Sequence, residues 1–127
     1  MTSAIRHFTV DCRDPYTLAL FWSQVIDTPM DPDDHPGDPC AIVRLGPGQP
    51  DLLFEQVPEP KSVKNRAHLD LQPAVPREQE VQRLVDLGAA QVADHRRPDG
   101  SGWVVLADPE GNEFCVERSQ AEREARD

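Results

Sequence analysis

Near the C-terminal end of the sequence, the stretch DPEGNEFCVE (108–117) carries a thiol and a carboxylate that could do chemistry. Asp-Pro and Glu-Gly are turn formers, and the residues after them alternate as in a β-strand. Side chains two positions apart on a strand share a face, so Cys115 and Glu117 point to one side, and Phe114 and Val116 to the other. Thiolates and carboxylates bind divalent metals, and a carboxylate also transfers protons. This strand face is therefore a candidate for metal binding or catalysis.

Two histidines occupy matching places in the two halves of the chain. His7 lies near the start of a predicted strand over residues 5–12, and His68 lies near the start of another over residues 66–72. Each shares its strand face with a further polar side chain, Thr9 in the first case and Asp70 in the second. Unpaired polar groups cost several kcal/mol to bury, so these faces indicate the lining of a wet cavity.

The elements that must position these side chains occur twice along the sequence. In each half, a strand is followed by a helix and then by further strands, which predicts an α+β fold of two βαβββ modules, each a sheet with a helix on one face. Asp14 can cap the first helix, with Pro15 at its first position, and Gly88 ends the second helix. The faces that meet the helices should bury Phe8, Val10, Leu69, Leu71, Phe114 and Val116.

Composition narrows the possible partners. The formal net charge of −10 disfavours nucleic acids and anionic membranes, and no apolar run approaches the ~20 residues that span a bilayer. Three widely spaced cysteines, without a CxxC pair, fit a reducing compartment better than a disulfide framework. The N-terminal segment shows no signal-peptide pattern. We therefore expect a cytoplasmic protein whose partner is a small molecule, with no nucleic acid or membrane as partner.

Most of the chain resembles a known superfamily, and four stretches carry the likeness: RHFTVDCRDPYTLALFW, LLFEQVPEP, NRAHLDL and WVVLADPEGNEFCVE. They are similar to the vicinal oxygen chelate superfamily, which includes glyoxalase I, fosfomycin-resistance enzymes, extradiol dioxygenases and bleomycin-resistance proteins. The nearest likeness is to short bacterial glyoxalase-like proteins. The resemblance implies a single domain over residues 1–118, whose paired modules form a curved, mostly antiparallel eight-stranded sheet around a cleft. Module one spans about 1–60 and module two about 61–118, and residues 119–127 form a charged tail.

The resemblance also implies a metal site with ligands on the first and last strand of each module. His7, Glu55 and His68 match three of these positions, and the fourth has two candidates. The family's count of seven residues from Asp108 of the turn reaches Cys115. The internal repeat gives Glu117, since Pro47 precedes Glu55 by eight residues and Pro109 precedes Glu117 by eight. Two neutral histidines and two carboxylates balance a divalent charge, which favours Glu117 as the fourth ligand or, off the metal, as the general base.

The function that this implies is a glyoxalase-like enzyme, a lyase or isomerase acting on a small molecule. A divalent metal, Zn, Ni, Fe, Mn or Co, would act as Lewis acid on neighbouring substrate oxygens. An alternative is a metal-free protein of the bleomycin-resistance type that binds or sequesters a drug or metabolite, with Trp103 as a stacking surface. A third is a regulatory or structural dimer with a vestigial site. The family resemblance implies a homodimer, and the substrate cavity is expected to include Thr9, Asp70, Trp103 and Cys115.

Overall fold

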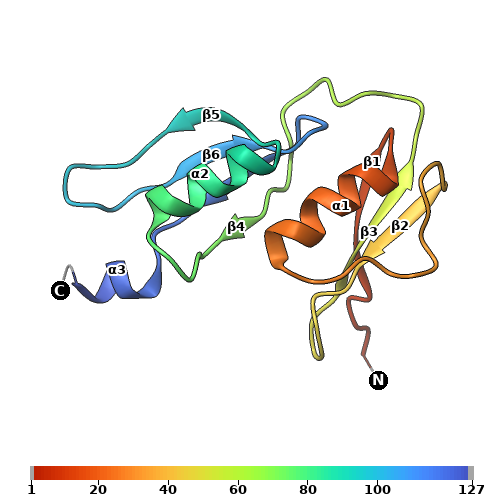
Figure 1. The fold of residues 1–127 in the computed structure, drawn as a ribbon, viewed down its shortest axis with the longest axis horizontal. Coiled ribbons are helices and arrows are strands. Elements are labelled where there is room, and N and C mark those ends of the chain that lie inside the picture. The colour runs from red at the N-terminus through yellow and green to blue at the C-terminus, as the bar shows by residue number, and fades with distance from the viewer. Residues whose placement is uncertain (1, 126–127) are drawn as a thin grey trace. The chain divides into compact units, whose positions relative to one another are not determined.

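The structure, a computed structural model, describes residues 2–125, so the last two residues of the predicted tail lie outside the described part. The chain divides into two compact units, Met1–Lys61 and Ser62–Asp127, and each has its own sheet and helices (Figure 1). Among the described residues, no helix combines the length and apolar character needed to cross a membrane.

The first unit is a three-stranded sheet with one helix. Its elements are β1 (His7–Cys12), α1 (Pro15–Ile26), β2 (Cys40–Val43) and β3 (Asp51–Gln56). The strand order is β1-β3-β2, with β1 parallel and β2 antiparallel to β3. Helix α1 begins as the sequence predicts, because the Asp14 carboxylate accepts a hydrogen bond from the Thr17 amide at 3.2 Å and Pro15 is the first helical residue.

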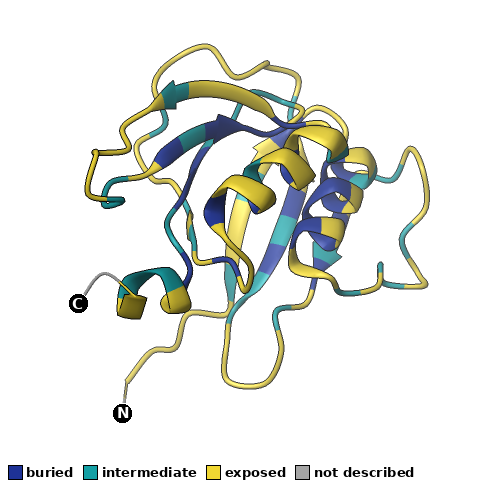
Figure 2. Cartoon of the chain, turned by 60° about the vertical axis from the view of Figure 1, so that its left-hand side comes forward, coloured by how far each residue is buried: buried dark blue, intermediate teal, exposed yellow. Residues whose placement is uncertain are grey.

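The core of this unit lies between α1 and the two strands that it contacts, β2 and β3. Figure 2 shows the buried residues of α1 on one side of the helix. They face buried strand residues, and the core of the unit includes Leu18, Phe21, Trp22, Val25, Val43, Leu52 and Phe54. The expectation that Phe8 is buried is wrong, since 47% of it is exposed. Phe8 shares a face with buried Leu52, but β1 is the edge strand on the side of the sheet away from β2, and α1 packs mainly against β2 and β3.

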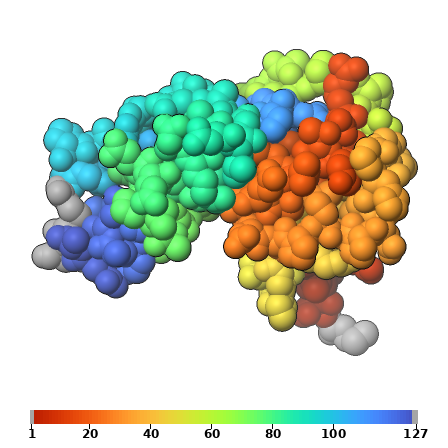
Figure 3. All heavy atoms as spheres, in the orientation of Figure 1, coloured from red at the N-terminus to blue at the C-terminus, as the bar shows by residue number. Residues whose placement is uncertain are grey.

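The second unit has a four-stranded sheet and two helices. Its elements are β4 (Asp70–Leu71), α2 (Arg77–Leu87), β5 (Ala90–Asp94), β6 (Val104–Ala107), β7 (Glu113–Val116) and α3 (Gln120–Ala125). The strand order is β4-β7-β6-β5, with only the β4–β7 pair parallel. Figure 3 shows the second unit from the side on which α2 lies. The core of this unit includes Leu84, Val104, Leu106, Phe114 and Val116.

The structure confirms an α+β fold but corrects the strand count. The described residues form seven strands in two sheets, not one eight-stranded sheet. Residues 27–39, between α1 and β2, contain no strand. This segment contains four prolines, which cannot donate to a strand ladder. The Asp31 carboxylate accepts a hydrogen bond from the Asp33 amide within the segment, and the Asp34 carboxylate accepts one from the Ile42 amide of β2. Of the predicted core residues, Phe114 and Val116 are buried, whereas Val10, Leu69 and Leu71 are half-buried.

Candidate functional site

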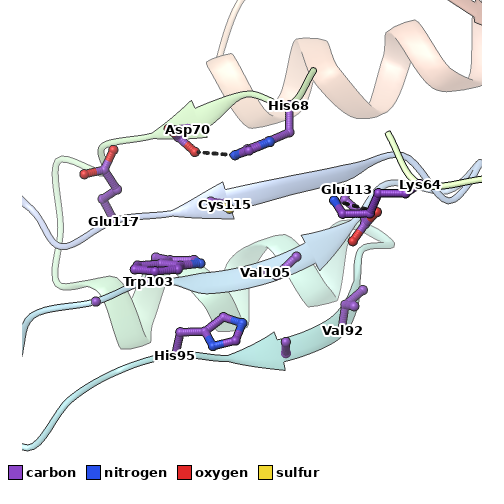
Figure 4. A pocket seen from close by; sticks show the side chains of 12 residues that line it. Lys64, His68, Asp70, Val92, His95, Trp103, Val105, Glu113, Cys115 and Glu117 are labelled. Carbon is purple, nitrogen blue, oxygen red and sulfur yellow. Dashed lines mark ion pairs between the residues drawn. The ribbon is translucent and has the colours of Figure 1, made fainter. Parts of the chain in front are cut away.

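The second unit contains a pocket of about 520 Å³ on its sheet (Figure 4). A row of cross-strand neighbours forms part of its wall: Asp70 of β4 pairs with Cys115 of β7, Cys115 with Val105 of β6, and Val105 with Ala93 of β5. Directly opposed residues of a sheet point to the same face, so the register brings these side chains together. The volume lies in the range typical of small-molecule sites, roughly 300–1,000 Å³.

One end of the pocket gathers an imidazole, a carboxylate and a thiol. Donor atoms of His68, Asp70 and Cys115 lie within 4.8 Å of one another. The strand predicted over residues 66–72 is shorter in the structure, where β4 begins at Asp70, so His68 lies just before it. His68 Nε2 lies 3.4 Å from Asp70 Oδ1. Cys115 joins them because it is the direct neighbour of Asp70 in the adjacent strand. All three side chains therefore belong to the second unit, where the pairing of β4 with β7 brings them together.

The thiol of Cys115 is held in its protonated form when no cation is near. Burial, reinforced by the charge of Asp70, raises the pKa of the Cys115 thiol to about 11. The residue is only 8% exposed, whereas His68 and Asp70 are exposed. A thiol in this environment is a poor nucleophile at neutral pH, because the thiolate is the reactive form. A bound cation would reverse this preference, since metals coordinate cysteine as the thiolate.

Two further carboxylates line the pocket, and each has a cationic neighbour. Glu113 Oε1 lies 3.2 Å from Lys64 Nζ, and Glu117 Oε1 lies 2.6 Å from Nη2 of Arg123 in α3. Glu117 follows Cys115 by two residues along the chain, a rise of about 7 Å. It shares the pocket with the three clustered donors but does not belong to their group. Its ion pair with Arg123 ties the predicted C-terminal tail to the pocket wall.

Three of the predicted site residues, His7, Thr9 and Glu55, lie in the first unit. In the parallel β1–β3 pair, His7 is opposite Asp51, and Glu55 is opposite Asp11. Thr9 lies between them on the same face. His7 and Glu55 are thus offset by four residues, a distance of about 13 Å along the strands. The structure does not bring this histidine and this carboxylate side by side, in contrast to the cluster in the second unit.

The other end of the pocket is aromatic and apolar. Trp103 and His95 lie side by side, with ring centroids 5.2 Å apart and planes tilted by 40°. The hydrogen bond from the His95 amide to the Trp103 carbonyl, 2.8 Å long, fixes their backbones. Val92 and Ala93 of β5 and Val105 of β6 add apolar side chains to the pocket wall. His95 is a pocket residue that the sequence patterns above did not identify; its spacing of two residues from Ala93 is the signal that could have placed it on the same face.

The chemistry of the donor set fits a divalent cation. Imidazole, carboxylate and thiolate are the ligands that zinc takes in proteins, and three protein ligands with an open position are typical of catalytic zinc sites. The thiolate favours softer ions, such as zinc, over manganese or magnesium. The donors already lie close enough together to share one ion. His68, Asp70 and Cys115 therefore meet the requirements of a metal site without the residues of the first unit.

Comparison with known proteins agrees with the fold. The model of the glyoxalase-like domain family matches residues 7–117, which is most of the chain. Among curated protein sequences, none is significantly similar to this chain.

Solved structures give the same picture at low sequence identity. A glyoxalase/bleomycin resistance protein/dioxygenase family enzyme from Burkholderia phytofirmans PsJN is 17% identical over 90% of this chain and 97% of its own, with a TM-score of 0.66. A mutant fosfomycin resistance protein, FosX, from Listeria monocytogenes, complexed with Mn(II) and 1S,2S-dihydroxypropylphosphonic acid, is 14% identical over 97% and 98%, with a TM-score of 0.66. FosX from Mesorhizobium loti is 16% identical over 98% and 99%, with a TM-score of 0.64. At these identities the likeness shows the fold alone.

Proposed function

The chain belongs to the glyoxalase-like domain family, and from this premise we propose that it is a small-molecule enzyme with a divalent metal held by His68, Asp70 and Cys115. The observation that carries the proposal is the 4.8 Å grouping of these three donors at the end of a 520 Å³ pocket. The thiol among the donors makes zinc the preferred ion. A bound cation would supply Lewis acidity toward neighbouring oxygens of the substrate.

The side chains of the pocket account for the remaining tasks of such a site. The apolar side chains of Ala93 and Val105 would displace water from the part of the substrate that they contact, which strengthens electrostatic interactions there. Glu117 is the proton acceptor in this proposal, because it lines the same pocket and its bond to Arg123 fixes its position. The proton would move to and from its carboxylate.

The proposal assigns no joint role to His7 and Glu55, in contrast to the ligand set that the family resemblance implies. Their offset of four residues on β1 and β3 supports this choice, since a single ion spans only about 4–5 Å between ligand atoms. Both residues remain useful as controls.

Metal analysis tests the proposal. The protein is purified without chelators, loaded with zinc, and compared with Cys115→Ser, Asp70→Asn and the control Glu55→Gln. We expect the affinity for zinc to fall at least about tenfold in the first two variants and to stay unchanged in the control. If zinc binds equally well to all four proteins, or only Glu55→Gln loses it, the three-donor assignment is wrong. Absence of zinc binding under every loading condition would remove the metal-dependent function itself.

A second candidate function rests on a different observation. The paired rings of Trp103 and His95 and the adjoining apolar wall could bind an organic ligand without any metal, as in a drug- or metabolite-sequestering protein. The protonated state of the Cys115 thiol is compatible with this function. A ligand that binds only the folded state raises its stability, so thermal-shift screening of zinc-free protein distinguishes this candidate. Hits that bind equally well with and without zinc would support it over the metal-dependent enzyme.

A further inference from the structure

The aromatic end of the pocket is the feature from which a ligand class can be inferred. Trp103 remains 37% exposed, although indole rings of this size are normally well buried. The other tryptophan of the chain, Trp22, is 4% exposed in the core of the first unit. Trp103 therefore presents a large flat surface to the pocket, beside the ring of His95.

This surface is held in place by buried contacts. Arg77, the first residue of α2, is only 4% exposed, and its guanidinium binds the strand connection that carries Trp103. Arg77 Nη1 donates to the Gly102 carbonyl at 2.7 Å, and Nη2 donates to the Gly100 carbonyl at 2.9 Å. Charge-assisted bonds of this kind are strong and directional. The position of Trp103 is thus set by the body of the unit and not by a loosely attached loop.

The backbone next to Trp103 is equally constrained. Gly102 has φ of +92°, and a Cβ at this position would overlap the carbonyl oxygen of His95. The close approach of these two segments is what places the Trp103 and His95 rings 5.2 Å apart. Only glycine allows it, because any side chain would force the segments apart.

The chemistry of this end differs from that of the donor cluster. The guanidinium carbon of Arg97 lies 5.7 Å from the centroid of the Trp103 ring, a cation–π contact that supports one part of the indole. Val105 and Ala93 continue the wall on the strands beside these rings, and the carboxylate of Glu117, which follows β7, also lines the pocket. Strand geometry puts Trp103 about 8 Å from Cys115 and about 12 Å from Asp70, measured between backbone positions. The pocket therefore presents aromatic rings on its β5–β6 side and the donor cluster on its β4–β7 side.

We propose that Trp103 and His95 form a subsite for a planar aromatic or heteroaromatic ring of the ligand. The same ligand places its polar, oxygen-bearing head at His68, Asp70 and Cys115. Strand spacing puts this cluster about 8 to about 12 Å from the ring subsite. The ring subsite stands on the geometry of the aromatic pair, whereas the placement of the head rests on the proposed function. Aromatic side chains stack on flat rings in offset or tilted arrangements. Such a ring pair contributes binding free energy beyond that of the buried apolar area, and the extra contribution corresponds to roughly 2- to 10-fold in affinity.

Two matched pairs of probes test this inference. The first pair is 4-phenylbutanohydroxamic acid and 4-cyclohexylbutanohydroxamic acid, which share a head of two neighbouring oxygens and the same number of carbons and differ only in whether the ring is aromatic. The second pair is 4-phenylbutanamide and 4-cyclohexylbutanamide, which lack the chelating head. Binding is measured by calorimetry and by quenching of Trp103 fluorescence in a Trp22→Phe background, with the hydroxamates on zinc-loaded protein and the amides on zinc-free protein.

We expect each aryl probe to bind roughly 2- to 10-fold more tightly than its alkyl counterpart. Trp103→Leu should abolish this preference, and Trp22→Phe should retain it. An aryl preference that survives in Trp103→Leu, or no preference in either pair, overturns the subsite. A further outcome is that the aryl amide binds more tightly than its alkyl counterpart while zinc does not raise the affinity for the hydroxamates. This result supports the ring subsite and contradicts the metal-dependent function. The two failures are therefore distinguishable.

Discussion

Truncation of Phe114 tests whether the second unit is built around the sheet face opposite the pocket. Phe114 is 1% exposed and lies opposite Leu106, which is fully buried, so Phe114→Ala removes a whole ring from a closed environment. Such substitutions cost about 3–5 kcal/mol of unfolding free energy. Phe8→Ala is the matched control. Burial of a whole large apolar side chain contributes ~1.5–3 kcal/mol to stability. Because 47% of Phe8 is exposed, Phe8→Ala should lower the unfolding free energy by roughly half of this, about 1 kcal/mol.

The two tryptophans allow each unit to be followed separately. Trp103 lies in the second unit with Phe114, and Trp22 lies in the first with Phe8. Urea unfolding would be monitored by Trp103 fluorescence in a Trp22→Phe background, and by Trp22 fluorescence in a Trp103→Phe background. A loss for Phe114→Ala below about 0.5 kcal/mol, the range of ordinary surface substitutions, would refute this description of the core. A loss for Phe8→Ala as large as that for Phe114→Ala would refute it as well.

Four further predictions concern three single residues, Cys115, Gly102 and Asp14. Cys115 should react with iodoacetamide far more slowly than exposed Cys40 at pH 7, because its pKa of about 11 leaves roughly one thiolate in 10⁴; comparable rates would contradict its burial. The same raised pKa means that the folded state holds the Cys115 proton more tightly than the unfolded state does. The protonated thiol should therefore contribute to stability below about pH 9, and this contribution should decline toward pH 11. Urea unfolding of the protein and of Cys115→Ala across this pH range measures it. Gly102→Ala should destabilise the protein by about 1–3 kcal/mol more than Gly48→Ala, because both glycines have positive φ but only Gly102 faces backbone atoms. Equal melting temperatures of the two variants would refute the close approach of Gly102 to the His95 carbonyl. Asp14→Ala should cost about 1 kcal/mol through loss of the α1 cap, and no loss in urea unfolding would contradict the capping bond.

Local patterns in the sequence predicted those parts of the fold that depend on neighbouring residues. The Asp14-Pro15 start of α1 is confirmed, and so is the alternation that buries Phe114 and Val116. The exposure of Phe8 could not be predicted in this way, because it depends on which strand lies at the sheet edge and how far α1 reaches. Strand order is a property of long-range pairing and leaves no local signal.

In the candidate site too, local spacing could be read from the sequence, whereas contacts between distant segments could not. The spacing of His68 and Asp70 predicts that their side chains lie on the same side of the chain, and the structure shows them in contact. Their contact with Cys115 depends on the register of β4 against β7, which local patterns do not determine. Arg77 gave no signal at all, because its role is to bind the carbonyl groups of Gly100 and Gly102, which are distant from it in the sequence. The predicted ligand role of Glu117 stays a prediction, and its pairing with Arg123 likewise arises from a tertiary contact.

The central claim is that a metal binds through the thiolate of Cys115 together with His68 and Asp70. X-ray absorption spectroscopy of the zinc-loaded protein tests it most directly, because sulfur is distinguished from nitrogen and oxygen by its longer bond. We predict one sulfur ligand at about 2.3 Å, with the remaining ligands at about 2.0–2.2 Å, and loss of the sulfur contribution in Cys115→Ser. A zinc ion surrounded only by nitrogen and oxygen in the unmodified protein would contradict the claim.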